Sequence, residues 1–252
     1  MTKDQESKLV QSVLEHLTDD NKYYGEYGRQ FLSNSDIYSL LNNPLNFRAS
    51  NQESKALLEG RYFHTLMLEP DKLDSFHIVD ATTRNTKVYK QTLAEQGVQM
   101  LLLKSEVDEI NFIADRMRSN LQFFDLIYEE GNQFERPGIK EIAGHMWKGK
   151  ADIIGKDHIL DLKTTSSLKD FNYKARVYNY DSQAYIYKKI FGKDLRFLVV
   201  EKRTGLLAIR DVSPDFLASG EHKVLQAVEQ YEKFFGSNAI EDVTNYYSYE
   251  VL

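Results

Sequence analysis

The sequence Asp161-Leu162-Lys163 follows Asp152 closely, and both stand in short apolar strands where charged side chains are uncommon. The Gly-Lys-Asp sequence at 155–157 between them predicts a tight turn. In the resulting antiparallel hairpin Asp152 lies opposite Asp161, with side chains about 5 Å apart. Lys163 projects from the same face as Asp161, because successive side chains of a strand alternate between its two faces. The spacing therefore predicts two carboxylates and a lysine at one point of a rigid sheet.

Two carboxylates at this distance repel each other unless a cation lies between them. Mg2+ is the expected ion, with Mn2+ able to replace it, because hard divalent cations prefer oxygen ligands and keep several waters. Lys163 would then orient or polarise a water beside the ion. This layout is typical of metal-dependent phosphodiester hydrolases. A surface hairpin with an Asp–Lys salt bridge would have the same spacing, but the apolar surroundings favour the metal site.

Four further side chains are candidates for the same site. Glu141 precedes the hairpin on a predicted strand and could supply a third carboxylate, although a solvent-facing strand glutamate fits the spacing equally well. His64 lies on a predicted helix among apolar residues, either as a hydrogen-bonded core residue or as a metal ligand. Gln183 and Tyr187 are four residues apart and share one helix face, which by itself indicates only an amphipathic rim.

The composition is that of a folded globular protein. The chain has 252 residues, of which 42% are hydrophobic and 12% aromatic, enough for one large domain with a full core. It contains no cysteine, which excludes disulfides, zinc–thiolate sites and iron–sulfur clusters. The sequence has neither an apolar run of the roughly 20 residues that a membrane helix needs nor a signal-peptide segment. We therefore expect a cytoplasmic protein that does not bind membranes.

The net charge of −6 is unusual for a protein that binds DNA, since phosphate contacts require local positive charge. The segment after the hairpin is nevertheless basic. Its candidate DNA contacts are Lys169, Lys174, Arg176 and Lys188. A solvated helix face would explain the same charges, so the pattern is compatible with nucleic acid without requiring it.

The spacing of apolar residues predicts mainly helices in the first half of the chain and strands with helices in the second. Helices are expected over 5–18, from about 33–36 to Pro44, and over 52–68, 87–128, 168–191 and 215–235; strands are expected over 139–147, 149–155, 158–164, 195–201 and 206–212. This order predicts an α/β fold with a mostly antiparallel sheet and a crossover helix. A single domain would span residues 1–252, mainly helical to about 130 and sheet-containing from about 131 to 252.

The order of these residues resembles that of the PD-(D/E)XK nucleases, in particular the exonuclease VIII (RecE-like) branch found in phages. The residues that carry the resemblance are His64, Glu141, Asp152, Asp161-Leu162-Lys163 and Gln183-x-x-x-Tyr187, with Asn43-Pro44, Gly60-x-x-x-His64 and Arg84-Asn85-Thr86-Lys87 upstream. The resemblance covers roughly residues 30–235. Ala151 stands where the family motif has its proline, a common departure.

The resemblance implies a restriction-endonuclease-like mixed sheet flanked by helices. It also implies roles for the candidate residues. Lys163 would activate the attacking water, while Gln183 and Tyr187 would orient Lys163 or touch the scissile phosphate. The implied metal ligands are Asp152, Asp161, the Leu162 carbonyl, Glu141 and His64.

The resemblance further implies a Mg2+-dependent exodeoxyribonuclease that degrades linear double-stranded DNA from 5′ to 3′ and exposes 3′ single strands for recombination in a bacterial or phage-infected cell. Its partners would be DNA ends, a single-strand annealing protein or recombinase, and further copies of the chain in a ring. An endonuclease or repair nuclease of the same fold is one alternative. A non-catalytic DNA-binding scaffold is another, although retention of Asp152, Asp161 and Lys163 argues against it.

Overall fold

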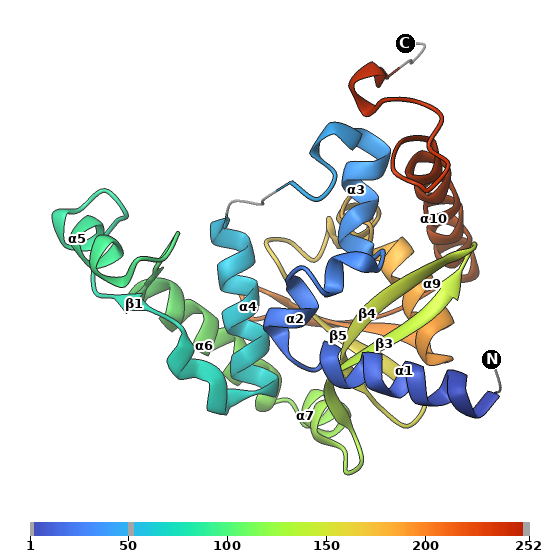
Figure 1. Cartoon of the computed structure of the whole chain (residues 1–252). Helices are drawn as coiled ribbons and strands as arrows, with labels where there is room; N and C mark the ends of the chain where they lie inside the picture. Colours follow the sequence, from blue (N-terminus) through green and yellow to red (C-terminus); the bar gives the residue numbers. More distant parts are fainter. Residues whose placement is uncertain (1–2, 50–52, 249–252) are drawn as a thin grey trace.

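A five-stranded sheet is the centre of the fold in the computed structural model, which describes residues 3–49 and 53–248 (Figure 1). The strands are β3 (Gln133–Ile142), β4 (His145–Ile154), β5 (His158–Thr165), β6 (Asp194–Glu201) and β7 (Leu207–Asp211). They lie in the order β3-β4-β5-β6-β7. Neighbouring strands are antiparallel except β5 and β6, which are parallel because a helical crossover joins them. The predicted mixed α/β sheet is thus present.

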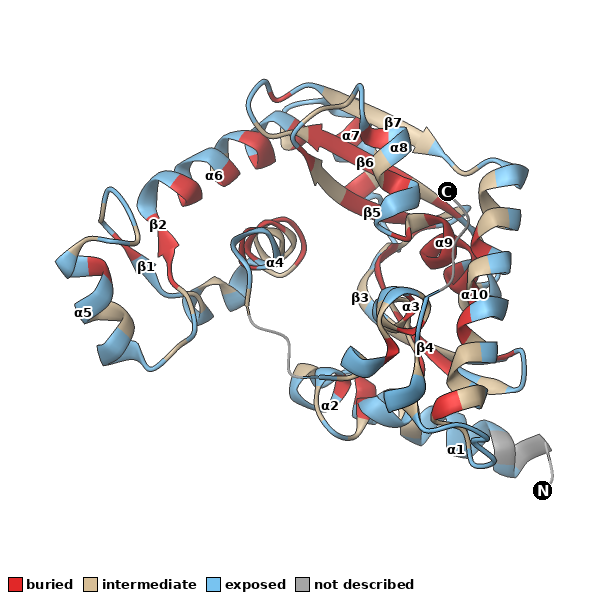
Figure 2. Ribbon diagram, turned by 90° about the horizontal axis from the view of Figure 1, so that it is seen from above, coloured by how far each residue is buried: buried red, intermediate tan, exposed pale blue. Residues whose placement is uncertain are grey.

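Helices cover both faces of the sheet, and each face has its own apolar core. One face packs against α3 (Asn34–Asn42), α9 (Tyr180–Phe191) and α10 (Pro214–Phe234), and the other against α4 (Lys55–Leu68), α6 (Lys104–Arg118) and α7 (Leu121–Tyr128). The first core contains Trp147 and Phe197, and the second contains Ile153 and Leu162. Figure 2 shows β5 and β6 buried between these layers. The central strands are therefore shielded on both sides, as apolar strands require.

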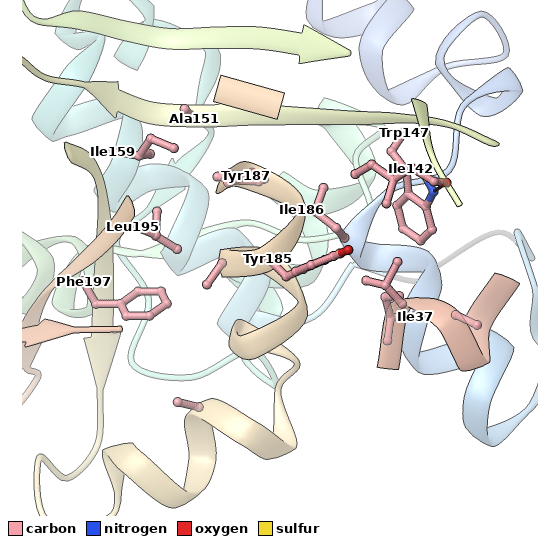
Figure 3. Packing of buried hydrophobic residues seen from close by; sticks show 14 of the residues in the cluster. Ile37, Ile142, Trp147, Ala151, Ile159, Tyr185, Ile186, Tyr187, Leu195 and Phe197 are labelled. Carbon is pink, nitrogen blue, oxygen red and sulfur yellow. Dashed lines mark hydrogen bonds between the residues drawn. The ribbon is translucent and has the colours of Figure 1, made fainter. Parts of the chain in front are cut away.

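Helix α9 lies unusually close to β3 and β4. Residues 181–187 are all buried, and Figure 3 shows Tyr185, Ile186 and Tyr187 packed among the strand residues. Glycines in both strands make this approach possible: a Cβ at Gly149 would lie 2.8 Å from the Tyr187 ring, and one at Gly138 would lie 2.4 Å from Ile190. The close packing fixes the helix over the strands that carry the candidate site.

A small unit between α4 and α6 projects from the sheet and has its own apolar core of Val79, Tyr89, Leu101 and Leu103 (Figures 1 and 2). It consists of β1 (Ile78–Val79), α5 (Lys87–Gln96) and β2 (Leu102–Leu103), with β1 and β2 paired in parallel. Arg84 fastens its base through two hydrogen bonds to Glu106, at 2.7 and 2.8 Å. Arg84 of the predicted upstream motif is therefore structural.

The N-terminal helices pack against the outer strand of the sheet. Leu17, Tyr23 and Phe31 form a small core with Ile139 of β3. These N-terminal helices are α1 (Lys3–Leu17) and α2 (Asp20–Tyr24). Elsewhere in the chain, α8 (Phe171–Val177) lies between β5 and α9. The short 3-10 helices are η1 (Gly28–Gln30), η2 (Pro44–Asn46), η3 (Pro70–Ser75) and η4 (Val243–Asn245). Within the described part of the chain, no helix is long and apolar enough to cross a membrane.

Two of the predicted helices are divided in the structure. The region 87–128 forms α5, α6 and α7 with β2 between the first two, because Gly97 ends α5 in a left-handed conformation (φ 64°) and Asn120 caps the start of α7. The region 168–191 forms α8 and α9, separated at Asn179, which is also left-handed (φ 59°). Asparagine tolerates this conformation better than most residues.

The prediction of one strand over residues 139–147 is wrong, because this segment contains a turn between two strands. Strand β3 ends at Ile142 and β4 begins at His145. Ala143 and Gly144 between them have φ of 50° and 81°, as a two-residue type I′ hairpin turn requires. The other predicted helices and the strands from residue 158 onward are confirmed, although residue 52 of the predicted 52–68 helix lies outside the described residues.

The elements before residue 130 are mainly helical, and the five-stranded sheet begins at Gln133. That residues 1–252 form one domain stays a prediction, with residues 1–2, 50–52 and 249–252 outside the described part.

Candidate metal and catalytic site

The predicted hairpin of β4 and β5 is present, with the predicted register. Ile153 pairs with Leu160, as expected for a turn centred on Lys156-Asp157. Continued by one residue, this register brings Asp152 level with Asp161. The local turn sequence and the apolar alternation therefore sufficed to place these two carboxylates on neighbouring strands.

The Asp152 side chain enters the space between the two strands, where the ladder has ended. Its Oδ2 accepts a hydrogen bond from the Leu162 backbone N–H at 2.7 Å and lies 3.3 Å from His64 Nδ1. The pleat is interrupted at this point: Ala151 packs in the core on one face and Ile153 in the core on the other. Residues two apart in a regular strand share a face. The irregularity lets Asp152 reach both His64 of α4 and the backbone of β5 at Leu162.

Asp161 is fully buried and contacts two other candidate residues. Gln183 Nε2 donates to its Oδ1 at 2.7 Å, and Lys163 Nζ lies 2.7 Å from its Oδ2. Lys163 satisfies Oδ2 as an ion pair, and no other group among the described residues donates to this oxygen. A carboxylate oxygen has two lone pairs, so Oδ2 can still take a cation as a further ligand.

The third carboxylate near Asp152 belongs to Glu135. Ligand atoms of His64, Glu135 and Asp152 lie within 4.8 Å of one another. The register of β3 and β4 accounts for this, because Phe134 pairs with Ile153 and Arg136 with Ala151, which brings Glu135 level with Asp152. Glu135 itself has a φ of 48°, a left-handed conformation that is rare for a strand residue and often found at functional sites.

The prediction that Glu141 supplies this carboxylate is corrected by the structure. Glu141 is exposed and pairs with Met146 beside the turn. It lies six positions along β3 from Glu135, about 20 Å away along the strand. The error follows from the missed turn at Ala143-Gly144. A hairpin centred there predicts Glu135 opposite Asp152. Recognition of Ala143-Gly144 as a two-residue hairpin turn could therefore have identified the correct glutamate.

The His64–Asp152 pair shows strongly shifted protonation. Burial alone would lower the pKa of His64, but the negative charge of Asp152 outweighs it and raises the pKa to about 9. Burial would likewise raise the pKa of Asp152, yet the charge and hydrogen bond of His64 lower it below its ordinary value. In the protein alone, His64 is thus a cation that balances Asp152.

The other acidic groups are less well balanced. Burial, followed by the charge of Asp152, raises the pKa of Glu135 to about 7, although Lys150 opposes the shift. Burial raises the pKa of Asp161 as well, against the effect of Lys163. The pKa of Lys163 is raised because Asp161 outweighs the desolvation that would lower it. The raised pKa values of Glu135 and Asp161 mean that both carboxylates are ionised at a cost in this buried site, and a bound cation would lower that cost.

Lys150 of β4 forms an ion pair with Glu135. Its Nζ lies 3.4 Å from Glu135 Oε2 and also contacts Asp20 of α2. Tyr187 donates a hydrogen bond from its hydroxyl to the Lys150 carbonyl at 2.7 Å. Neither Lys150 nor Asp20 was identified from the sequence, because a contact across 130 residues leaves no local signal.

Gln183 and Tyr187 both face the strands of the site. Gln183 donates to Asp161 and so orients a carboxylate. Tyr187 is buried, and its hydroxyl donates to the β4 backbone at Lys150. That they orient Lys163 or touch the scissile phosphate stays a prediction. The Leu162 carbonyl as a metal ligand stays a prediction.

The donor set fits a divalent cation. A histidine nitrogen and two carboxylates converge, and Asp161 adds a buried oxygen from the next strand. Oxygen-rich sets of this kind suit Mg2+ and Mn2+. His64, Glu135, Asp152 and Asp161 would hold the ion, which when bound supplies charge neutralisation and polarisation of a phosphate and a water.

The predicted DNA-contacting residues fall into two places. Lys169, Lys174 and Arg176 lie just beyond β5 and on α8; Lys169 and Arg176 are exposed, while Lys174 Nζ contacts Ser166 Oγ at 2.9 Å. Lys188 is separate, because its Nζ lies 2.6 Å from Asp194, at the end of β6 that pairs with the start of β5. The structure does not bring Lys188 to the site, and DNA contact by the other three stays a prediction.

The sequence profile of the family described as a PDDEXK-like domain of unknown function (DUF3799) matches residues 39–238. The chain belongs to this family. The predicted PD-(D/E)XK membership, the mixed α/β fold and the enzyme class of a nuclease hydrolase are thereby confirmed. The comparison with curated proteins gives no match.

One solved structure shares the fold. A "Putative exonuclease" from Eubacterium rectale is 21% identical over 93% of this chain and 95% of that chain, with a TM-score of 0.66. More distant are an alkaline exonuclease from Laribacter hongkongensis (12% identity, 81% and 88% of the two chains, TM-score 0.34) and a phage-related exonuclease from Haemophilus somnus 129PT (11%, 62% and 89%, 0.32). The last two similarities are too weak to support any inference about this chain.

Proposed function

We propose that this nuclease is an exodeoxyribonuclease that uses Mg2+, or Mn2+ in its place, to hydrolyse phosphodiester bonds of linear double-stranded DNA from 5′ to 3′. The observation that carries the proposal is the convergence of His64, Glu135 and Asp152 within 4.8 Å, beside Asp161 and Lys163 on the next strand. Exposed 3′ single strands would then enter recombination.

Within this proposal Lys163 acts as a hydrogen-bond donor. Its raised pKa keeps it protonated at neutral pH, since Asp161 outweighs the effect of burial. A protonated amine cannot accept a proton from water. It can hold a water or a phosphate oxygen in place and stabilise the negative charge that develops there. Gln183 keeps Asp161 oriented toward Lys163, so the two strand residues work from a fixed position.

The Eubacterium rectale structure is described as a putative exonuclease, which supports action from DNA ends over internal cleavage. The similarity between the two proteins concerns the fold alone. We therefore favour DNA ends as the substrate over the endonuclease and repair alternatives. A single-strand annealing protein or recombinase would receive the 3′ strand. Assembly of several 29.3 kDa chains into a ring around DNA is part of the proposal and is testable by sedimentation.

Linear and closed DNA distinguish the alternatives. End-labelled linear duplex with 5′-phosphate or 5′-hydroxyl ends should be degraded progressively in Mg2+, while a covalently closed circle of the same sequence should survive. The order in which labels at the two ends are released gives the polarity. Cleavage of intact supercoiled plasmid as fast as end digestion would support an endonuclease instead. Binding without any cleavage would support the scaffold alternative.

A further inference from the structure

The three carboxylates of the metal site each have one basic partner. The pairs, all within 3.4 Å, are Asp152 with His64, Asp161 with Lys163 and Glu135 with Lys150. His64 is itself a candidate ligand, and Lys163 holds water or phosphate in the proposed function. Neither role covers Lys150, although its side chain is only 9% exposed beside the cluster.

One carboxylate of the cluster is shared between two functions. Glu135 Oε2 lies 3.4 Å from Lys150 Nζ, and Glu135 also contributes a ligand atom to the group of three that converges within 4.8 Å. Lys150 and a divalent ion in the cluster would therefore both draw on the negative charge of Glu135. Two cations near one carboxylate repel each other, the more so where little water screens them.

Lys150 differs from the other two bases because it is divided between two acids. Its Nζ lies 2.5 Å from Asp20 Oδ1 of α2, whereas no second acid pairs with His64 or Lys163 among the described residues. Asp20 is 45% exposed and stands outside the cluster. The more of the lysine charge Asp20 takes, the less remains for Glu135.

The main chain around this pair is fixed without the ammonium group. Lys150 is paired with Pro137 in the ladder of β3 and β4, and the same ladder brings Glu135 level with Asp152. The Tyr187 hydroxyl donates to the Lys150 carbonyl at 2.7 Å. Removal of the lysine charge should therefore leave Glu135 where it is.

We propose that Lys150 is an internal counter-ion of Glu135 and sets the affinity of the cluster for its divalent cation. In the metal-free protein it lowers the cost of an ionised carboxylate beside Asp152. When the ion binds, the same positive charge opposes it. The inference rests on the proposed metal-dependent nuclease function and adds a residue that determines how much metal the site requires.

Binding of Mn2+ to the full chain without DNA tests the proposal. Lys150→Met keeps most of the length of the side chain and removes its charge. In isothermal titration calorimetry it should bind Mn2+ about 10-fold or more tightly than wild type, since a charge within about 4–6 Å changes the affinity of a carboxylate for a proton by at least about this factor. Lys150→Arg keeps the charge and should bind Mn2+ like wild type.

Replacement of Asp20 should act in the opposite direction. Asp20→Asn leaves the charge of Lys150 to Glu135 alone, so Mn2+ should bind more weakly than to wild type. In the Lys150→Met background the same replacement should have much less effect, because the residue through which it acts is absent. Lys22→Met removes an exposed lysine of the same helix and is the matched control, which should bind Mn2+ like wild type.

A structural role for Lys150 predicts the opposite sign. If the lysine only fastened α2 to β4, Lys150→Met would lower the melting temperature in EDTA and weaken Mn2+ binding. Mn2+ affinity equal to or below that of wild type in Lys150→Met would overturn the proposal, as would weaker binding of DNA in Ca2+ with unchanged Mn2+ affinity. If Lys150→Met does not fold, Asp20→Asn decides: Mn2+ binding equal to that of wild type would refute the proposal.

The two proposals fail in different ways. Tighter Mn2+ binding by Lys150→Met, without cleavage of any DNA by wild type, would refute the nuclease function and leave the counter-ion role intact. Normal digestion of linear DNA by wild type, with the same Mn2+ affinity in wild type and Lys150→Met, would refute the counter-ion role and leave the nuclease function intact.

Discussion

Replacement of Glu135 by glutamine should make the metal-free protein more stable, and only at neutral to alkaline pH. The ionised Glu135 side chain is 18% exposed and faces Asp152, and burial together with that charge raises its pKa from 4.5 to about 7. A difference of 2.5 pKa units, at about 1.4 kcal/mol for each, corresponds to a cost of about 3 kcal/mol for ionising this group in the folded protein.

The pH range of the effect follows from the two pKa values. Below pH 4.5 Glu135 is neutral in both folded and unfolded chains, so its ionisation costs nothing. Between pH 4.5 and about 7 the unfolded chain releases the proton first, and above pH 7 the full cost is present. In EDTA, Glu135→Gln should therefore raise the melting temperature by about 6–12 °C at pH 8 and very little at pH 4.5.

Metal binding should act against this difference in melting temperature. Mg2+ or Mn2+ stabilises the form that binds it, so addition of the ion should raise the melting temperature of wild type more than that of Glu135→Gln. Glu141→Gln is the matched control and should alter neither stability nor metal binding, because Glu141 is exposed beside the turn. An unchanged melting curve of Glu135→Gln at pH 8, or loss of metal binding in Glu141→Gln, would refute the reasoning.

Three further substitutions test individual contacts. Lys163→Ala should still bind DNA ends in a gel-shift assay but not cut them. His64→Ala should lower activity, and in EDTA it should destabilise the protein, because the cation that balances Asp152 is removed. The loss of stability should be complete below about pH 6.5 and should disappear as the pH rises through 9. A destabilisation of about 1–3 kcal/mol with full activity would instead mark a core histidine. Burial would raise the pKa of Glu106, but Arg84 and its other partners lower that pKa to about 2. Glu106→Gln should therefore lower the free energy of unfolding in urea by about 3 kcal/mol at pH 7. This difference should shrink as the pH falls from 4.5 toward 2.

The sequence was sufficient for the β4–β5 hairpin because everything that specifies it is local. The turn at Lys156-Asp157 and the alternation of apolar residues fix the register, and the register places Asp152, Asp161 and Lys163. His64 could be assigned only through the resemblance, since its helix packs on the sheet through contacts that periodicity does not reveal.

The remaining parts of the site depend on tertiary structure. A turn at Ala143-Gly144 decides between Glu135 and Glu141, and a single missed turn moved the expected carboxylate by six positions. Lys150 reaches Asp20 across 130 residues. The parallel pairing of β1 with β2 involves two residues from each strand, too few for any alternation to be recognised.

The most direct test of the central claim is release of end label from linear duplex DNA by purified wild type and Asp161→Asn. Wild type should release label in Mg2+ or Mn2+, not in EDTA, and Ca2+ should support binding without release. Asp161→Asn should be at least about 10³-fold slower, because metal-assisted chemistry contributes several kcal/mol to the lowering of the barrier. Label release that persists in EDTA, or a normally active Asp161→Asn protein, would contradict the assignment of this cluster as the catalytic metal site.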